Sequence, residues 1–442
     1  MRESVSAIFV FEDEVFSIQR QNYLSVFPGY CAFPGGKVDK EDSNVALVSH
    51  DLFADKESYQ LNALFREVSE ELNFDVLANL NRIVSIDMIG IAITPEFNPY
   101  RFKNFYFRIT LNEKVSFVVD EGEAKSARWS KAHELLERYE RAEILAVPPA
   151  VKLFKALDRD IQFSHSIDLS LEHDPATETP MIESLYGVKQ FLPLSHTFPP
   201  ANRTNCFLIG DKHSVLIDPS PKDEIELAKL KNHLSKFQVN EIFLTHHHPD
   251  HHEHSVELAK FYDVKIGLSL DTHTRILSKH GQDYFQNLEL NYYKEGDILT
   301  QSLGQDVLVY EVPGHDEGQL ALAPRNLNWF IVGDLIQSVG TVVIGAPEGD
   351  MSKYFNSLEK VIKLAPRFVI PSHGIALGGV HKLKMTLKHR KMREEKIRSL
   401  LEHSHTNEEI LDIIYEGLDK RLTPYALKTI EAHIVKIKSE LT

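Results

Sequence analysis

Short apolar runs separated by a charged turn open the chain and predict paired strands. Residues 6–11 and 15–18 are mostly apolar, and the acidic triplet 12–14 separates them. Two apolar runs joined by a short polar turn are typical of a β-hairpin. Farther on, residues 63–72 place their apolar side chains at helical spacing, which predicts an amphipathic helix.

Four apolar runs in the second half of the chain each lead into a residue that can bind metal. Residues 241–244 lead into a histidine-rich segment. The three later runs are 307–309 before His315, 329–332 before Asp334, and 368–370 before His373. We expect these runs to be buried strands, and side chains at strand ends are rigidly mounted. Predicted helices alternate with predicted strands here, which favours helices layered on sheets.

The last part of the chain changes character and predicts three helices. Residues 381–401 carry a helical pattern, Thr406-Asn407 signals a helix start before 410–418, and Thr423-Pro424 begins a third helix that runs to Leu441. The first of these helices carries the basic residues Lys382, Lys384, Lys388, Arg390, Lys391, Arg393, Lys396 and Arg398. Such a stripe favours either a helical cap with a solvated face or a surface that follows phosphates.

Length and composition narrow the class of protein. At 442 residues the chain is too long for one core, so two to three domains are expected. The predicted divisions are a domain at 1–160, a polar linker at 161–180, a domain at 181–380 and a C-terminal domain at 381–442.

Charge, cysteine content and hydropathy exclude further classes. A net charge of −15 argues against indiscriminate coating of nucleic acid, although a local basic patch stays open. Cys31 and Cys206 are the only cysteines, so a disulfide framework is not expected. No apolar run approaches the roughly 20 residues of a membrane span, and the N-terminus has no apolar signal segment. We therefore expect a cytoplasmic protein without a membrane partner.

The segment 245–252 carries four metal-competent side chains within six residues. His246 and His248 are two apart on an extended backbone, so their rings leave on the same side. Asp250 and His251 follow a proline that turns the chain. Together they supply half of the ligands that two neighbouring metal ions need. A histidine-rich surface loop without metal is the alternative, and the three strand-end residues farther along count against it.

The order His-x-His-x-Asp-His, then a lone His, a lone Asp and a last His, resembles the metallo-β-lactamase superfamily over roughly residues 180–380. The resemblance implies a four-layer αβ/βα sandwich. It assigns His246, His248 and His315 to one metal ion, Asp250, His251 and His373 to a second, and Asp334 to a bridge between them. Asp218 matches a family aspartate and would orient the histidine segment. Residues between Asp334 and His373, together with the tail, resemble the subgroup of lactamase-β-like endoribonucleases and polyketide thioesterases, whose tail is winged-helix-like.

The ligand chemistry predicts the cofactors and the nucleophile of this domain. Nitrogen and carboxylate ligands without thiolate favour two Zn²⁺ ions, with Mn²⁺ and Fe as alternatives. A water shared by two cations ionises near neutral pH, and the resulting hydroxide would be oriented by Asp250 while that residue also ligates. His247, His252 and His254 fall outside the ligand positions, so we expect them at the surface or behind the ligands.

Three glutamates on the N-terminal helix form a second candidate site. Glu67, Glu70 and Glu71 stand at i, i+3 and i+4, so they share one helical face. Their mutual repulsion becomes ligation if Mg²⁺ or Mn²⁺ lies among them. A solvated acidic face is the alternative interpretation.

Gly35-Gly36-Lys37-Val38 followed by an Arg-Glu-x-x-Glu-Glu helix resembles the Nudix box of pyrophosphate-cleaving hydrolases, which implies an α/β/α sandwich and a catalytic role for Glu67 and Glu70. Thirty residues separate Gly36 from Arg66 where the box has 14, Asp42 stands where it has Glu, and Asn73 stands where it has Gly. Inserted boxes and the segment 94–107 resemble the coenzyme A diphosphatase-like branch. Glu123 is a further acidic candidate by the same resemblance.

The expected molecule combines α/β and α+β domains: a Nudix sandwich, a metallo-β-lactamase sandwich and a helical tail. Three functions are compatible with it. The first is hydrolysis of an ester or thioester, with a coenzyme A or nucleotide derivative connecting the two domains. The second is cleavage of single-stranded RNA, and the third is a Nudix domain that senses a nucleotide without turnover and regulates the hydrolase. The oligomeric state stays open.

Overall fold

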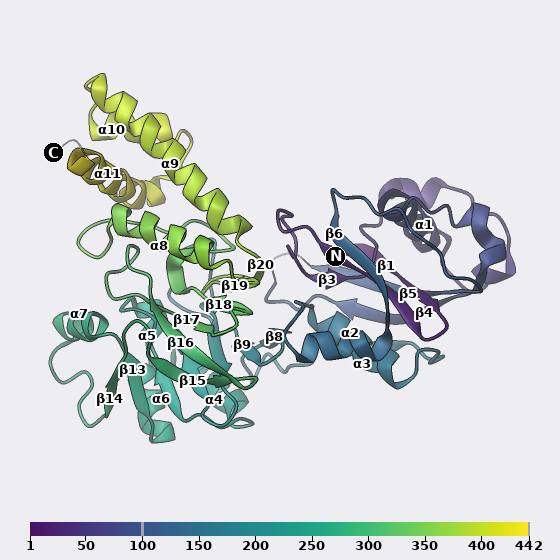
Figure 1. Cartoon of the computed structure of the whole chain (residues 1–442), viewed down its shortest axis with the longest axis horizontal. Helices are drawn as coiled ribbons and strands as arrows, with labels where there is room; N and C mark the ends of the chain where they lie inside the picture. The colour runs from purple at the N-terminus through teal and green to yellow at the C-terminus, as the bar shows by residue number, and fades with distance from the viewer. Residues whose placement is uncertain (99–100, 441–442) are drawn as a thin grey trace. The chain divides into compact units, whose positions relative to one another are not determined.

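The computed structural model describes residues 1–98 and 101–440 (Figure 1). It divides into two compact units, the first made of Met1–Glu172 with Glu183–Tyr186 and the second of His173–Ile182 with the chain from Gly187 onward. Within the described residues, no helix combines the length and apolar character needed to cross a membrane.

The first unit is a mixed sheet with helices on both faces. Its strands are β1 (Arg2–Phe11), β2 (Glu14–Arg20), β3 (Cys31–Ala32), β4 (Ile83–Ile93), β5 (Phe102–Leu111), β6 (Ala124–Lys131) and β7 (Ile167–Asp168). Its helices are α1 (Ser58–Leu72), α2 (Ala132–Glu140) and α3 (Pro148–Arg159), with 3-10 turns at Lys40–Asn44, Asp51–Phe53 and Leu77–Arg82. The strand order is β3-β2-β1-β5-β4-β7, and β6 pairs with β2. β7 falls in the predicted linker 161–180 and pairs with β4 at the sheet edge.

The pattern of β1 explains why helices cover both faces. Val5, Ala7 and Phe9 belong to a core cluster with Leu64 and other residues of α1. The alternate residues Ile8 and Val10 belong to a second cluster with side chains of α2 and α3. Successive side chains of a strand point to opposite faces, so β1 is buried between two helical layers (Figure 1). This is the predicted α/β/α sandwich, and the predicted hairpin is the antiparallel pair β1–β2.

The second unit contains two sheets. The first sheet has the order β14-β13-β12-β11-β10-β9, and β8 (Met181–Leu185) lies where the two units divide. Its strands are β9 (Val188–Phe191), β10 (Cys206–Ile209), β11 (Val215–Ile217), β12 (Glu241–Phe243), β13 (Lys265–Leu268) and β14 (Leu290–Tyr292). The other sheet runs in sequence order through β15 (Ile298–Ser302), β16 (Gln305–Glu311), β17 (Leu320–Pro324), β18 (Trp329–Ile331), β19 (Phe368–Ile370) and β20 (Leu377–Gly378).

Each of these sheets is covered by its own helices, as the αβ/βα arrangement requires. The helices are α4 (Glu224–Leu234), α5 (Pro249–His252), α6 (Ser255–Tyr262), α7 (Leu270–His280) and α8 (Met351–Leu364), with a 3-10 turn at Gly333–Leu335. Leu227 of α4, Leu258 of α6 and Ile276 of α7 share a core with the first sheet. Phe355 and Leu358 of α8 share a core with the second sheet.

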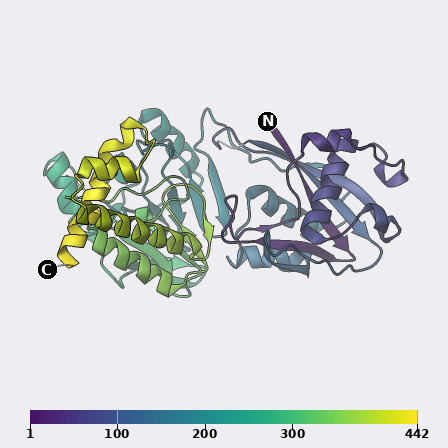
Figure 2. The same cartoon turned by 90° about the horizontal axis from the view of Figure 1, so that it is seen from above.

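The C-terminal region is helical and packs on α8. It contains α9 (His381–Glu402), α10 (Asn407–Ile414), a 3-10 turn at Lys420–Leu422 and α11 (Thr423–Glu440), while Leu441 of the predicted third helix lies outside the described residues. Leu383 of α9 and Ala432 of α11 join the core of α8, and Figure 2 shows these helices side by side in yellow and green. Our prediction of the middle helix was confirmed at its start, where Thr406 is the N-cap and Glu408 and Glu409 lie in the first turn, and was wrong at its end, which is Ile414 and not Leu418. Thr406 caps a start at Asn407, and the helix stops before Gly417, whose φ is +76°.

Candidate metal centre

Parallel strand pairing gathers the candidate ligands at common sheet edges. β11, β12 and β13 are parallel neighbours, so Asp218 after β11 and His246 after β12 leave the sheet at the same edge. In the other sheet, β18 and β19 are parallel, which places Asp334 and His373 together. The segment after His248 contains α5, a single helical turn that begins at Pro249. That turn carries Asp250 and His251.

His246, His248 and His315 form the first group. Nδ1 of His248 lies 3.0 Å from Nε2 of His246 and 2.9 Å from Nε2 of His315. A tetrahedral Zn²⁺ with bonds of about 2.0–2.1 Å needs ligand nitrogens about 3.4 Å apart. The three nitrogens are therefore spaced closely enough to share one ion.

Asp250, His251 and His373 form the second group. Oδ2 of Asp250 lies 3.6 Å from Nε2 of His373 and 3.8 Å from Nε2 of His251. Asp334 lies between the two groups. Its Oδ1 is 3.3 Å from Nε2 of His373, and its Oδ2 is 3.7 Å from Nε2 of His315. The structure thus brings all seven predicted ligands to one place, with Asp334 in reach of both groups.

The buried polar atoms of this centre fit a pair of cations. Nε2 of His251, Nε2 of His373 and Oδ1 of Asp334 are buried, and none has a hydrogen-bond partner among the residues that the structure describes. Leaving such an atom unsatisfied costs roughly 1–3 kcal/mol, and more for a charged group. A cation bound among them would satisfy all three at once.

The remaining ring nitrogens are held by hydrogen bonds that aim the ligand nitrogen inward. Nδ1 of His315 lies 2.9 Å from the carbonyl oxygen of Val343, and Nδ1 of His373 lies 3.0 Å from that of Arg203. A carbonyl only accepts, so each Nδ1 carries its proton and each Nε2 keeps a lone pair for a metal. Nδ1 of His251 is held in the same way, 2.8 Å from Oδ2 of Asp218.

The electrostatic environment differs between the two groups of the centre. Burial, reinforced by the neighbouring histidines, lowers the pKa of His246 and His248 well below its ordinary value, so both are neutral imidazoles. Burial would raise the pKa of Asp334, but His373 and His251 hold it well below its usual range. Burial opposes protonation of His251, but Asp250, Asp218 and Asp334 outweigh it and raise the pKa. Because neutral imidazoles and ionised carboxylates are the forms that bind metal, His246, His248 and Asp334 are in binding form, whereas a cation would take the place of the proton on His251.

Asp218 holds His251 of the second group in place, and we expect its replacement to weaken metal binding. It is buried, and besides His251 it accepts hydrogen bonds from the backbone N–H of Thr245 at 2.8 Å and the hydroxyl of Thr245 at 2.6 Å. Asp218→Asn keeps the shape of the side chain but replaces one oxygen, which accepts hydrogen bonds, by an NH₂ group that donates them. We expect metal affinity to fall about 10–100-fold. Competition with a chromophoric chelator measures this, and unchanged affinity would show that Asp218 does not orient His251.

The other histidines of the segment have distinct partners. His247 and Asp316 are both buried, and Nδ1 of His247 contacts Oδ2 of Asp316. His252 is buried with Nδ1 2.9 Å from the Tyr284 hydroxyl, and His254 lies 3.3 Å from Glu257. His247 and His252 are therefore not at the surface. Our sequence reasoning missed Asp316, although its place directly after His315 was the signal.

Of the three glutamates of α1, Glu67 and Glu70 pair with the same cation, Arg66. Arg66 Nη1 lies 2.8 Å from Oε1 of Glu67 and 3.4 Å from Oε2 of Glu70. Arg66 also makes two hydrogen bonds of 3.1 Å to the carboxylate of Asp42 across the inserted segment. Within residues 1–98 and 101–440, these glutamates do not belong to any group of three ligand atoms that lie within 4.8 Å of one another.

Glu71 is the buried member of this set. Its Oε2 accepts a hydrogen bond of 3.0 Å from the backbone N–H of Gly35, which ties the Gly-Gly segment to α1. Burial raises the pKa of Glu71 to about 7, with further contributions from the charges of Glu67 and Glu123. Burial also raises the pKa of Glu67. Glu123, the further acidic candidate, has Oε2 3.8 Å from Nη2 of Arg20.

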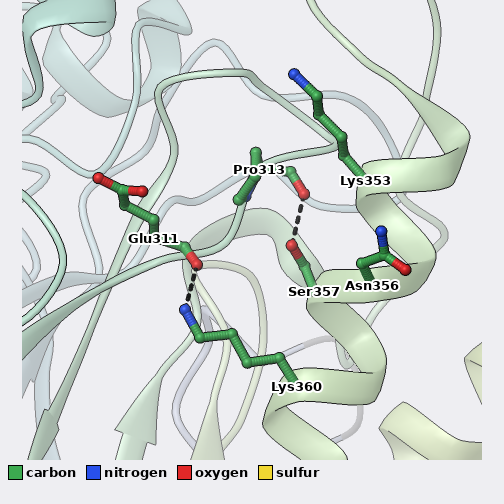
Figure 3. A pocket seen from close by; sticks show the side chains of 6 residues that line it. All are labelled: Glu311, Pro313, Lys353, Asn356, Ser357 and Lys360. Atoms are coloured by element: carbon green, nitrogen blue, oxygen red, sulfur yellow. Dashed lines mark hydrogen bonds between the residues drawn. The ribbon is translucent and has the colours of Figure 1, made fainter.

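A separate cavity of about 260 Å³ lies beside the segment that leads to His315 (Figure 3). Its lining residues are Glu311, Pro313, Lys353, Asn356, Ser357 and Lys360. Ser357 donates to the carbonyl of Pro313 at 2.7 Å, and Lys360 donates to that of Glu311 at 2.8 Å. None of the predicted ligands lines this cavity, so it is distinct from the metal centre.

Comparison with known proteins finds two families. Residues 199–373 match the model of the metallo-beta-lactamase superfamily, and residues 1–148 match the model of the NUDIX domain. Beta-lactamase-like protein 2 homolog of Drosophila melanogaster is 26% identical over 254 residues, which are 54% of this chain and 82% of that protein. Hydroxyacylglutathione hydrolase of Francisella tularensis is 26% identical over 176 residues, which are 39% of this chain and 64% of that enzyme.

A solved structure, a beta-lactamase domain protein from Burkholderia ambifaria, aligns with a TM-score of 0.52 and 20% identity. The alignment covers 61% of this chain and 91% of the bacterial one. At this identity the likeness shows a shared fold.

Proposed function

Because the chain joins a NUDIX domain to a hydrolase domain of the metallo-beta-lactamase superfamily, we propose that its central domain hydrolyses thioesters with a pair of metal ions. The observation that carries the proposal is the convergence of seven imidazole and carboxylate side chains, in two groups that share Asp334. Two bound Zn²⁺ ions would supply a Lewis acid and a water that is nucleophilic at neutral pH.

The exposure of the ligands indicates the side from which a substrate enters. His246, His251 and His373 are fully buried, whereas His248 and Asp250 are partly exposed. The Asp250 side chain keeps 14% of its surface accessible. In this proposal Asp250 faces the incoming substrate, orients the attacking water through its carboxylate, and accepts a proton at that carboxylate during turnover.

A thioester is favoured over other substrates by the relatives and by the first domain. The Francisella relative is a hydroxyacylglutathione hydrolase, and a hydroxyacylglutathione is a thioester. A coenzyme A thioester contains both a thioester and a pyrophosphate, the group that a Nudix domain handles. We therefore propose acyl-coenzyme A as the substrate class, with the Nudix domain binding or cleaving the nucleoside diphosphate part by means of Glu67, Glu70 and Glu71 and a Mg²⁺ or Mn²⁺ ion.

Cleavage of single-stranded RNA is the second candidate, and the basic stripe of α9 is the feature that favours it. Several basic residues of that stripe already contact other groups of the protein. Arg390 is buried, Arg393 lies over the Tyr415 ring, and Lys391 and Arg398 pair with acidic residues. This engagement leaves fewer cations for phosphates, so RNA enters the experiment below as a comparison substrate.

The proposal predicts chelator-sensitive release of free thiol. Purified protein loaded with Zn²⁺ should hydrolyse an acyl-coenzyme A or an S-acylglutathione at steady state. Dialysis against a strong chelator should lower that rate at least about 100-fold, and added Zn²⁺ or Mn²⁺ should restore it. A labelled RNA oligomer serves as the comparison substrate. Metal-dependent RNA cleavage without thioester turnover would replace the proposal, and chelator-resistant thioester turnover would refute it.

A further inference from the structure

Arg390 of α9 is a basic residue buried in the second unit beside the metal-bearing loops. Only 3% of its surface is exposed. Its Nη2 donates a hydrogen bond to the carbonyl oxygen of Val342, and its guanidinium lies 5.6 Å from the centre of the Tyr354 ring. A planar guanidinium can donate along its edge and stack on a ring with its face at the same time. Arg390 therefore links α9 to the 336–350 segment and to α8.

The first contact of Arg390 leads to the ligand His315. Val342, whose carbonyl accepts from Arg390, is followed by Val343, whose carbonyl lies 2.9 Å from Nδ1 of His315. In this short segment the carbonyl of Val342 accepts from Arg390, and the adjacent carbonyl of Val343 accepts from the ring of His315. If this segment shifted, the hydrogen bond that keeps Nε2 of His315 aimed at the centre would be lost.

The second contact of Arg390 leads to Asp334. The ring of Tyr354 is fully buried under the guanidinium, and its hydroxyl donates at 2.8 Å to the carbonyl of Leu335, directly after Asp334. The backbone of Tyr354 also packs on Gly314, where an added Cβ would lie 2.2 Å from the Tyr354 nitrogen at a φ of +131°. The Arg390–Tyr354 pair therefore touches the segments that carry both His315 and Asp334.

We propose that Arg390 is a positioning residue of the metal centre, through which the C-terminal helices set the metal affinity of the His246, His248 and His315 group. The inference rests on the metal centre proposed above. Arg390 does not touch the ligands; it acts through the carbonyls of Val342 and Leu335. The competing explanation is that Arg390 only packs α9 against α8, as the apolar residues around it do.

A matched pair of variants separates these explanations. Arg390→Met removes the guanidinium but keeps an unbranched side chain in the core. Arg393→Met removes the neighbouring guanidinium of α9, which lies 4.8 Å from the Tyr415 ring. Tyr415 contacts α10 side chains in a separate cluster, away from the metal-bearing loops. Both variants lose a cation–π contact of the same helix, and only the first loses a contact to the ligand segments.

The measurement is equilibrium Zn²⁺ binding by chelator competition, together with the absorption spectrum of the Co²⁺-loaded protein. We expect Arg393→Met to bind two equivalents of Zn²⁺ with the same affinities as the wild type. Arg390→Met should bind one of the two about 10–100-fold more weakly and show an altered Co²⁺ spectrum. Wild-type affinities and spectrum in Arg390→Met would overturn the inference. A wild-type protein that binds no metal would instead refute the metal centre itself.

Two milder variants cover the case in which Arg390→Met does not fold. Tyr354→Phe keeps the ring beneath Arg390 and removes only the hydrogen bond to Leu335. Arg390→Lys keeps the charge but replaces the planar fork by a single ammonium. Each should weaken one of the two equivalents several-fold. Unchanged metal binding in both variants would overturn the inference.

Discussion

Replacing His248 by alanine is expected to lower kcat/KM for thioester hydrolysis by about 1,000-fold or more and to remove one of two bound metal equivalents. His248 contacts both other members of the three-histidine group, because its Nδ1 lies within 3.0 Å of Nε2 of His246 and Nε2 of His315. Without it, two protein nitrogens remain for that ion. A thousandfold loss corresponds to about 4 kcal/mol of transition-state stabilisation. Metal analysis and steady-state kinetics on the same preparation measure both effects.

His254→Ala is the control for this prediction. His254 belongs to the same histidine-rich stretch, but its Nδ1 pairs with Glu257 rather than with the centre. It should keep both metal equivalents and most of the activity. If His248→Ala retained two equivalents and wild-type kcat/KM, the assignment of the three-histidine group would fail. If His254→Ala lost activity to the same degree, the assignment of the metal ligands in this stretch would be wrong.

The positions of the candidate ligands could be predicted from the sequence because strands present them. His246, His315, Asp334 and His373 each follow a buried apolar run, and the parallel pairing of β18 with β19 brings Asp334 and His373 to one edge. The partners that aim these ligands could not be predicted in the same way. His315 and His373 are held by the carbonyls of Val343 and Arg203. Every residue has a carbonyl, so no residue type marks these two.

The fold of the first unit was predictable for a related reason. The hairpin β1–β2 follows from two apolar runs around a short acidic turn, and the helix α1 follows from apolar residues at helical spacing. The pairing of Arg66 with Asp42 joins residues separated by the inserted segment, and no local pattern reports it. The burial of Arg390 could not be predicted from a local pattern either. On the sequence it is one of eight basic residues in a stripe, and only tertiary packing separates it from the others.

Replacing Glu70 by glutamine is expected to separate the two activities of the chain. Any Mg²⁺-dependent cleavage of a nucleoside diphosphate derivative should fall about 10²–10⁴-fold, as for the loss of a group that ligates metal or moves a proton. Hydrolysis at the metal centre of the second unit should be unchanged. The Glu70 side chain is 61% exposed and pairs with Arg66 four residues earlier, so its replacement should cost little stability. Release of the nucleotide half, which follows cleavage of the pyrophosphate, and release of free thiol from one coenzyme A thioester report the two sites.

Glu137→Gln is the matched control, because Glu137 makes an exposed ion pair with Arg141 four residues away in α2 of the same unit. It should leave both activities intact, and this would assign the effect of Glu70→Gln to the site rather than to the loss of a surface charge. A simultaneous fall of thiol release and nucleotide release in Glu70→Gln would show that the two sites are not independent. Nucleotide binding by the wild type without cleavage of the pyrophosphate would identify the Nudix domain as a sensor. In that case the regulated quantity should be thiol release at the metal centre, measured with and without the bound nucleotide.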